Sequence, residues 1–396
     1  MLPAKEMKQI QKIIQDEINQ QEIAGCNLLV LHQGKEVFYH EDGYANVEQQ
    51  TPIKRDSIFR LYSLSKPITA TAVMILFERG ALDLYEPVSQ FLPGFQNQMV
   101  EVNGRLEPVQ RDMMIKDLLS MSSGLVYEGT HLAGQKTQAL FQSIEDALVN
   151  PSLSSPSTVD AMNQLGTYPL AFHPGTSWEY GTSADVLGAI VEVVSKKSFG
   201  SFLQEELFTP LGMKDTGFFV PIEKQNRLTT VYQKQENSPL SIYSRNYLGI
   251  QNQMVQNPAF ESGGAGLVST VDDYAKFANM LMQGGKYQDQ QILKPSTVAF
   301  LTGSTLHTKL QVIFEDWVAL AGHSYGNLMR VLTTPSQAGV LGCQGEYGWD
   351  GWLGAYFCNC PKEELTILLM MQKTDAGTTT LTRKIRNILI SSLTDF

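Results

Sequence analysis

The chain of 396 residues has little cysteine and no excess of positive charge. Four cysteines are too few for a disulfide scaffold in a protein of this length. Lysine and arginine total 30 against 40 aspartates and glutamates, which gives a net charge of −10. Nucleic acids and anionic membranes select concentrated cationic surfaces, so the composition predicts neither as a partner.

The sequence given also shows no long apolar run, and its first residues do not predict a secretory leader. No run approaches the roughly 18 residues that a membrane-spanning helix needs. Residues 1–25 are charged throughout and lack an apolar core followed by a small-residue cleavage site. We therefore expect a cytoplasmic protein without a membrane span.

The remaining absences concern cofactors and metals. Neither a phosphate-binding G-x-x-x-x-G-K-[ST] loop nor a G-x-G-x-x-G dinucleotide motif is present, so no cofactor is expected. Cys358 and Cys360 lie two residues apart and could be drawn with Cys343 as a metal site. No second pair follows at ligand spacing, so we expect buried reduced thiols and no metal.

The composition is typical of a packed globular protein, since 43% of the residues are hydrophobic. Strand patterns occur at both ends of the chain and mostly helical patterns lie between them. This order predicts a mixed α/β (α+β) fold, in which one antiparallel sheet is built from both termini. We expect an α/β lobe at 1–80 and 288–396, and a mainly helical lobe at 81–287 with a loop excursion at 222–262. Helix patterns near residues 7–18 and 380–393 predict terminal helices that cover the sheet.

The strongest chemical signal is Ser63, the only serine with a lysine, Lys66, three positions later. Positions i and i+3 share a helix face, so the hydroxyl and the amine can be neighbours. Pro67 is tolerated in a first helical turn, which predicts Ser63 at a helix N-terminus with free backbone N–H groups nearby. A serine hydroxyl needs a base, and lysine can serve once its pKa falls from about 10.4 toward neutrality.

A second serine motif, Gly322-His323-Ser324-Tyr325-Gly326, spells the G-x-S-x-G of α/β-hydrolases. That motif requires a strand before it, a helix after it, and an acid and a histidine later in the chain. No histidine follows Ser324. We therefore interpret Ser324 as structural.

Several segments in order resemble the serine β-lactamase and penicillin-binding-protein superfamily, and most closely its class C-like branch with the family VIII carboxylesterases. Arg60 to Pro67 is similar to the nucleophile segment of that family. Further similar segments are Leu118 to Leu125, Phe172 to Thr182, Pro210 to Met213 and Gly263 to Thr270. The resemblance extends over about residues 25–375 and implies a β-lactamase/transpeptidase-like fold.

By this resemblance Ser63 is the acylated nucleophile, Lys66 its partner and Tyr180 the third catalytic group. A lysine ammonium nearby would favour the tyrosine anion, which could then accept the serine proton. The reverse assignment, with neutral Lys66 as the base, remains open at this point. The oxyanion hole would be formed by the backbone N–H groups of Ser63 and Trp352.

The chain departs from β-lactamases at two positions of the site. Trp349-Asp350-Gly351 stands where they have Lys-Thr-Gly, and Thr182 stands where they have an asparagine that holds the acylamino arm. Asp350 would repel the carboxylate of a β-lactam. We interpret these residues and Tyr127 as candidate substrate contacts, and His173, which precedes Pro174-Gly175, as a residue that caps a turn.

These departures favour a small-molecule substrate that is a neutral ester or amide, most simply a small to medium carboxylic ester. A weak β-lactamase or D-amino-acid peptidase is the first alternative. A non-catalytic relative that binds cell-wall fragments or a protein is the second. The sequence leaves open the oligomeric state, the acyl and alcohol preference, and whether water or another alcohol accepts the acyl group.

Overall fold

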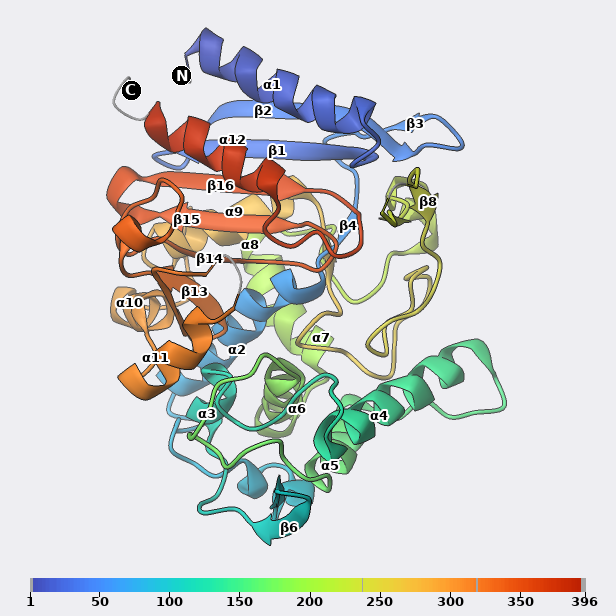
Figure 1. Cartoon of the computed structure of the whole chain (residues 1–396), viewed down its shortest axis with the longest axis vertical. Coiled ribbons are helices and arrows are strands. Elements are labelled where there is room, and N and C mark those ends of the chain that lie inside the picture. The colour runs from blue at the N-terminus through green and yellow to red at the C-terminus, as the bar shows by residue number, and fades with distance from the viewer. Residues whose placement is uncertain (1–2, 237, 318–319, 393–396) are drawn as a thin grey trace.

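The computed structural model describes residues 3–236, 238–317 and 320–392, and its main feature is an eight-stranded sheet. Both ends of the chain contribute to it, in the order β12-β13-β14-β15-β16-β1-β2-β3 (Figure 1). All neighbouring strands are antiparallel. The strands are β1 (Gly25–His32), β2 (Lys35–Asn46), β3 (Thr51–Pro52), β12 (His323–Gly326), β13 (Met329–Leu332), β14 (Tyr347–Asp350), β15 (Tyr356–Cys360) and β16 (Leu365–Met370).

The two faces of the sheet are covered by different helices because side chains alternate along each strand. Leu28 and Val30 of β1 pack with α1 (Ala4–Asn19) and α12 (Thr380–Ser391), which lie side by side over one face (Figure 1). Leu29 belongs to the large core on the opposite face, where α2 (Lys66–Glu78) and α9 (Val271–Met282) lie.

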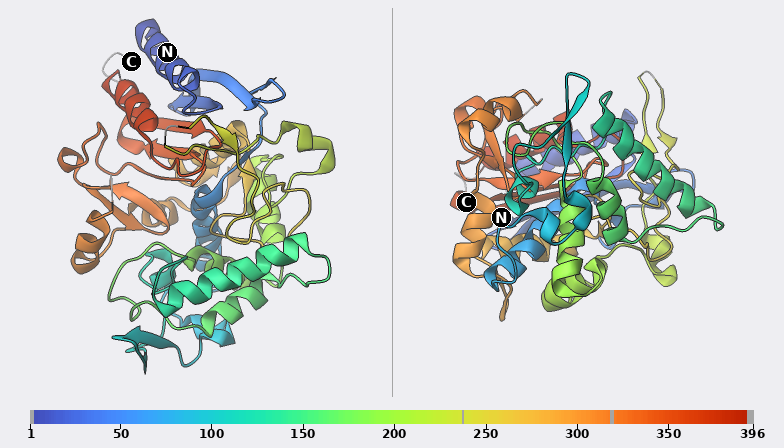
Figure 2. Two further views of the ribbon diagram at one scale, coloured as in Figure 1. Left: turned by 45° about the vertical axis from the view of Figure 1, so that its right-hand side comes forward. Right: turned by 90° about the horizontal axis from the view of Figure 1, so that it is seen from below.

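The other helices form most of the remaining structure. Figure 2 shows α4, α5 and α6 gathered away from the sheet, on the side opposite to α1 and α12. Within the described ranges, no helix combines the length and the apolar character needed to cross a membrane. These helices are α3 (Ile115–Leu119), α4 (Leu132–Val149), α5 (Thr158–Gly166), α6 (Ser183–Ser195), α7 (Phe199–Leu203), α8 (Thr209–Leu211), α10 (Pro295–Gly303) and α11 (Thr308–Glu315).

Short strand pairs tie distant segments together. One pair matters for the site, because it joins the strand before Ser63 to the glycine-rich segment that precedes α9. The pairs are β4 (Phe59–Arg60) with β9 (Val268–Ser269), β5 (Met99–Val102) with β6 (Arg105–Pro108), β7 (Tyr232–Gln233) with β8 (Ser241–Ile242), and β10 (Lys286–Tyr287) with β11 (Gln290–Gln291).

The sheet built from both termini and the covering terminal helices agree with the sequence prediction. The predicted last helix ends at Ser391, and Leu393 lies outside the described residues. The division into lobes at 1–80 with 288–396 and at 81–287 stays a proposal. Helix α9 packs against β16 and β1, although the proposed boundary assigns it to the helical lobe.

The expectation of reduced thiols is wrong for two of the four cysteines. Cys343 and Cys360 form a disulfide, while Cys26 and Cys358 are free and buried. The pairing was missed because the loop before β14 brings Cys343 over the end of β15, a proximity that the spacing of 17 residues does not reveal. Disulfides persist mainly in oxidising compartments, which is a reason to test the predicted cytoplasmic location.

Candidate active site

Ser63 lies in a short 3-10 turn, Tyr62–Ser65, which leads directly into α2. Tyr62 just before it has a φ of 45°, a left-handed conformation that is uncommon for a bulky residue. Its buried ring packs edge-on against Trp352, with ring centroids 5.0 Å apart, and this packing holds the turn. Backbone of this kind is often found at functional sites, where the surroundings enforce it. Ser63 itself is partly exposed between buried neighbours.

Lys66 lies one helical turn after Ser63 and is fully buried. Its Nζ lies 3.1 Å from Ser63 Oγ, 3.0 Å from the Tyr127 hydroxyl and 2.9 Å from the Gly264 carbonyl oxygen. Burial lowers the pKa of Lys66 to about 7, although the charges of Asp185 and Asp350 act in the opposite direction. At neutral pH a large fraction of this lysine is therefore the free amine.

The three contacts of Lys66 suit a neutral amine, which has two N–H donors and one lone pair. The carbonyl of Gly264 can only accept a hydrogen bond, and the oxygen of Tyr127 can accept a second one. The lone pair is then left for the hydroxyl of Ser63, which can donate to it. The geometry thus offers Ser63 a base.

Tyr180 lies beside both Ser63 and Lys66, with the Lys66 Nζ 4.5 Å from the centroid of its ring. Its phenol is hydrogen-bonded to Ser63 and accepts a bond of 2.9 Å from the Trp349 indole Nε1. Burial raises the pKa of Tyr180 despite these two hydrogen bonds, which lower it. The expectation that a lysine ammonium favours the Tyr180 anion is therefore wrong: desolvation raises the pKa of Tyr180, and burial also brings the pKa of Lys66 down toward neutrality.

The Gly264 carbonyl is fixed by residues that the sequence analysis did not assign. Asp185 of α6, which is buried, accepts hydrogen bonds from Gly264 N (2.9 Å) and from Ser262 Oγ (2.5 Å). A side chain on Gly264 would contact the Tyr127 hydroxyl and Asp185, so only glycine fits. The glycine-rich match at 263–270 was the available signal, but it gave no reason to connect this segment with Lys66.

Gly351 lets the end of β14 approach the turn that carries Ser63. A Cβ there would lie 2.1 Å from the Leu61 carbonyl oxygen, so a side chain would push the two segments apart. In the described part of the chain, the backbone N–H groups of Ser63 and Trp352 donate no hydrogen bond to protein. Both amides therefore remain free to bind an oxyanion, as their proposed role requires.

The candidate substrate contacts differ in their exposure. Thr182 is fully buried and its hydroxyl has no partner among the described residues, while Trp349 and Gly351 are also buried. The role of these three residues as substrate contacts stays a prediction. Tyr127 is only partly buried and lies beside Lys66.

Asp350 does not present an isolated negative charge. Its carboxylate forms a 3.2 Å ion pair with Arg330 and a hydrogen bond with Thr378. The buried guanidinium of Arg330 therefore offsets part of the repulsion that Asp350 is expected to exert on anions. Since Arg330 is directed at Asp350 and buried, it does not supply the exposed cation that a β-lactam carboxylate would need.

Two other sequence candidates lie outside this arrangement. Ser324 is buried in β12, and its Oγ accepts a hydrogen bond from the Leu306 amide, so a structural role agrees with its surroundings. The strand turns back into β13 rather than leading into a helix, which excludes a nucleophile elbow. His173 pairs with Glu107 of β6 at 3.2 Å and does not reach Ser63.

A cluster of aromatic side chains flanks Tyr180, and the sequence gave no reason to group its members. The ring of Trp317 lies 5.0 Å from that of Tyr180 and 5.3 Å from that of Trp178, measured between centroids. Trp317 is 38% exposed, so one edge of this cluster faces solvent beside the proposed site. Phe314 and Tyr325 complete the packing.

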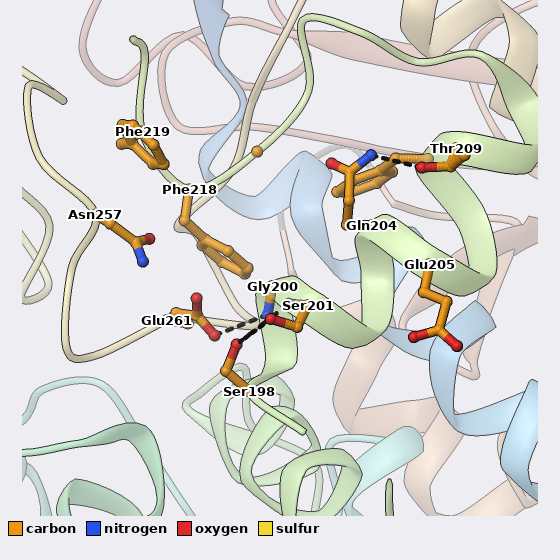
Figure 3. Close-up of a pocket in the computed structure, with 12 residues that line it drawn as sticks. Ser198, Gly200, Ser201, Gln204, Glu205, Thr209, Phe218, Phe219, Asn257 and Glu261 are labelled. Carbon is orange, nitrogen blue, oxygen red and sulfur yellow. Dashed lines mark hydrogen bonds between the residues drawn. The ribbon is translucent and has the colours of Figure 1, made fainter. Parts of the chain in front are cut away.

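The pocket shown in Figure 3, of about 560 Å³, is a separate feature. Its lining includes Phe218 and Glu261, whose carboxylate accepts a hydrogen bond from the Gly200 amide over 2.7 Å. Ser63, Lys66 and Tyr180 do not line it. We assign it no part in the chemistry.

Comparisons with known proteins agree with this fold. The profile of the family described as Beta-lactamase matches residues 10–390, so the chain belongs to that family. This also confirms the superfamily resemblance drawn from the sequence.

Relatives and solved structures extend the comparison. Protein Rv1367c of Mycobacterium tuberculosis (strain ATCC 25618 / H37Rv) is 30% identical over 364 residues, covering 88% of this chain and 86% of the relative. Esterase EstB of Burkholderia gladioli is 27% identical over 357 residues, covering 86% and 84% respectively. The solved structure described as EstCE1, a hydrolase with promiscuous acyltransferase activity, aligns with a TM-score of 0.81 at 24% identity. That alignment covers 98% of this chain and 99% of the other, which confirms the fold. Together the relatives support a function of the serine-hydrolase type.

Proposed function

We propose that the chain hydrolyses small to medium carboxylic esters through an acyl-enzyme formed on Ser63. One observation carries this proposal: the partly exposed Ser63 hydroxyl contacts a buried amine whose pKa is lowered to about 7 and the phenol of the partly buried Tyr180. Acyl transfer needs a nucleophile, a base and a second proton-transfer group. Here the base and the second group both contact the nucleophile.

In the proposed reaction, unprotonated Lys66 takes the Ser63 proton while Oγ forms a bond to the ester carbonyl carbon. The N–H groups of Ser63 and Trp352 stabilise the oxyanion. Its collapse breaks the bond to the alcohol, whose oxygen takes a proton from Tyr180, and the Lys66 ammonium restores that proton. Water then attacks the acyl-enzyme. Tyr180 takes a proton from this water after passing its own to Lys66, and the Lys66 ammonium returns a proton to Ser63 Oγ as the acid leaves.

The surroundings of the site favour a neutral ester over a β-lactam. Trp349 replaces the lysine expected in β-lactamases, and the nearby Arg330 is paired with Asp350. Among the relatives, EstB is named as an esterase, which agrees with this substrate class.

The test compares p-nitrophenyl butyrate with the β-lactam nitrocefin, using the wild type and two alanine variants. Ser63→Ala should abolish butyrate hydrolysis and labelling by a fluorophosphonate, whereas Ser324→Ala should retain both. Faster turnover of nitrocefin would favour a β-lactamase. No turnover of either substrate and no covalent label would favour the non-catalytic binding alternative.

A further inference from the structure

A groove runs from the proposed catalytic residues along α4. It consists of three adjoining cavities of about 450, 180 and 400 Å³, and Gln142 and Glu145 line all three. One cavity includes Tyr127, whose hydroxyl contacts Lys66, and another includes Trp352, whose amide is proposed for the oxyanion hole. We call this feature the Glu145 groove. Its position makes it the place where a substrate would extend beyond its ester group.

Aromatic rings form one wall of the Glu145 groove. Trp352 packs against Tyr247 with centroids 4.5 Å apart and against Tyr243 with centroids 5.4 Å apart. Faces of tryptophan and tyrosine rings attract ammonium and guanidinium groups. The chain already shows this attraction, because the Arg245 guanidinium carbon lies 5.4 Å from the centroid of the Tyr243 ring.

The charged side chains of the groove are mostly acidic. The described residues that line it include one cationic side chain, Arg245. They include four carboxylates, those of Glu128, Glu145, Asp146 and Asp375. Asp375 accepts a 2.8 Å hydrogen bond from the Trp352 indole, which places a carboxylate at the edge of the aromatic wall.

Glu145 is the acidic group common to all three cavities. Its Oε1 accepts a hydrogen bond from the Gly249 amide over 3.0 Å, yet partial burial still raises the pKa of its carboxyl group. A cation placed in the groove would offset this desolvation by a favourable charge interaction.

We propose that the Glu145 groove binds a cationic nitrogen, so that esters carrying a quaternary or protonated amine are preferred substrates. This rests on the proposed esterase function and specifies its substrate class. The ammonium group would lie against Trp352 and Tyr247, with Glu145 and Asp375 as counter-ions. A negatively charged substituent would be disfavoured by the same carboxylates.

The test uses two pairs of compounds that differ only in charge. Butyrylthiocholine and S-(3,3-dimethylbutyl) thiobutyrate place the cation on the leaving group. The p-nitrophenyl esters of 4-(trimethylammonio)butyrate and 5,5-dimethylhexanoate place it on the acyl group. In at least one pair we expect kcat/KM to be about 10-fold higher for the cation at low salt, with a smaller ratio at high salt.

Variants identify the groove as the cause. Glu145→Gln should lower the cation-to-neutral ratio about fivefold, and Arg245→Gln should raise it by removing the competing cation. Asp16→Asn, on α1 and far from the groove, is the matched control and should leave the ratio unchanged. A ratio of one or less in both pairs, or a ratio that Glu145→Gln leaves intact, would overturn the proposal.

A binding measurement separates this proposal from the proposed function. Calorimetry should show that wild-type protein binds choline more tightly than 3,3-dimethylbutan-1-ol, and that Glu145→Gln removes the difference. If p-nitrophenyl butyrate is not hydrolysed, the esterase function fails. Choline binding then still tests whether the Glu145 groove binds a cation. If the ester is hydrolysed but neither cationic compound is preferred and choline does not bind, only the cation site fails.

Discussion

The indole Nε1 of Trp349 donates a hydrogen bond to the phenol oxygen of Tyr180 over 2.9 Å. Trp349 therefore contacts a proposed catalytic side chain, at the position where β-lactamases are expected to carry a lysine. Its bond orients the phenol toward Ser63 and lowers the pKa of Tyr180 against the stronger effect of burial. The tripeptide that departs from the β-lactamase pattern is thus part of the proton-transfer arrangement that we propose.

Replacing Trp349 with phenylalanine should reduce kcat for p-nitrophenyl butyrate about 10-fold with little change in KM. The variant keeps an aromatic ring but removes a hydrogen bond, typically worth about 1 kcal/mol, and leaves the Tyr180 phenol less well oriented. Trp178→Phe is the matched control, since the Trp178 Nε1 has no partner among the described residues. Equal losses in the two variants would mean that ring packing, not the hydrogen bond, accounts for the effect.

The pH dependence of the reaction should follow Lys66. Because the free amine is the proposed base and burial lowers the pKa of Lys66 to about 7, activity is expected above that pH and lost below it. The slope of log kcat/KM should approach one on the acidic side. A profile that stays flat between pH 6 and pH 9, measured with an activated ester, would exclude Lys66 as the titrating base.

Asp185→Asn should move that acidic limb to lower pH. The Asp185 charge raises the pKa of Lys66, so its removal lowers this pKa and extends activity toward acid. An asparagine oxygen can still accept the bonds from Ser262 and Gly264, which keeps the Gly264 carbonyl in place. A limb that does not shift would indicate that Asp185 is already neutral in the folded protein, in keeping with its raised pKa.

Much of the fold follows from local patterns in the sequence. Residues 28–31 are all apolar, which is typical of a strand buried on both faces, and Leu28 and Leu29 do pack into different cores. The spacing of Ile10 and Ile14 places both on one face of the first helix, and this face is buried against the sheet. The serine–lysine spacing placed Ser63 and Lys66 on one helical turn for the same reason. In each case the partners are a few residues apart, so the geometry of one element decides the contact.

The features that were missed depend on contacts between distant segments. Asp185 and Gly264 meet only through packing of α6 against the segment before α9, and Cys343 meets Cys360 through the course of a loop. The pKa of Tyr180 was assigned the wrong direction because desolvation depends on the whole surrounding core. Burial and tertiary contact are not encoded in the spacing of residues along the chain.

Stability should depend strongly on a buried ion pair that attaches α12 to the loop before β14. Arg386 and Glu346 are both almost fully buried, and Arg386 Nη2 donates to Glu346 Oε2 over 2.6 Å. Glu346→Ala leaves the guanidinium without its counter-ion, so we expect a loss of about 3–5 kcal/mol in urea unfolding. Glu206→Ala breaks a pair with the largely exposed Arg79 and should cost less than about 1 kcal/mol.

Gly351→Ala should impair catalysis strongly while the protein stays folded. A Cβ at this position would lie 2.1 Å from the Leu61 carbonyl oxygen, and backbone cannot move aside as a flexible side chain can. The end of β14 must then shift away from the turn that carries Ser63, which moves the Trp352 amide out of the proposed oxyanion hole. Loss of one oxyanion donor typically costs about 100-fold or more in kcat.

The matched control for this variant is Gly303→Ala at the end of α10, where a Cβ would meet nothing within 4 Å. We expect Gly303→Ala to retain full esterase activity and an unchanged urea midpoint. For Gly351→Ala, the strain of an overpacked contact should lower the unfolding free energy by about 1–3 kcal/mol and leave a folded protein whose kcat can be measured. Full activity in folded Gly351→Ala would contradict the proposed role of the Trp352 amide, because the strained contact should displace that amide from the oxyanion hole.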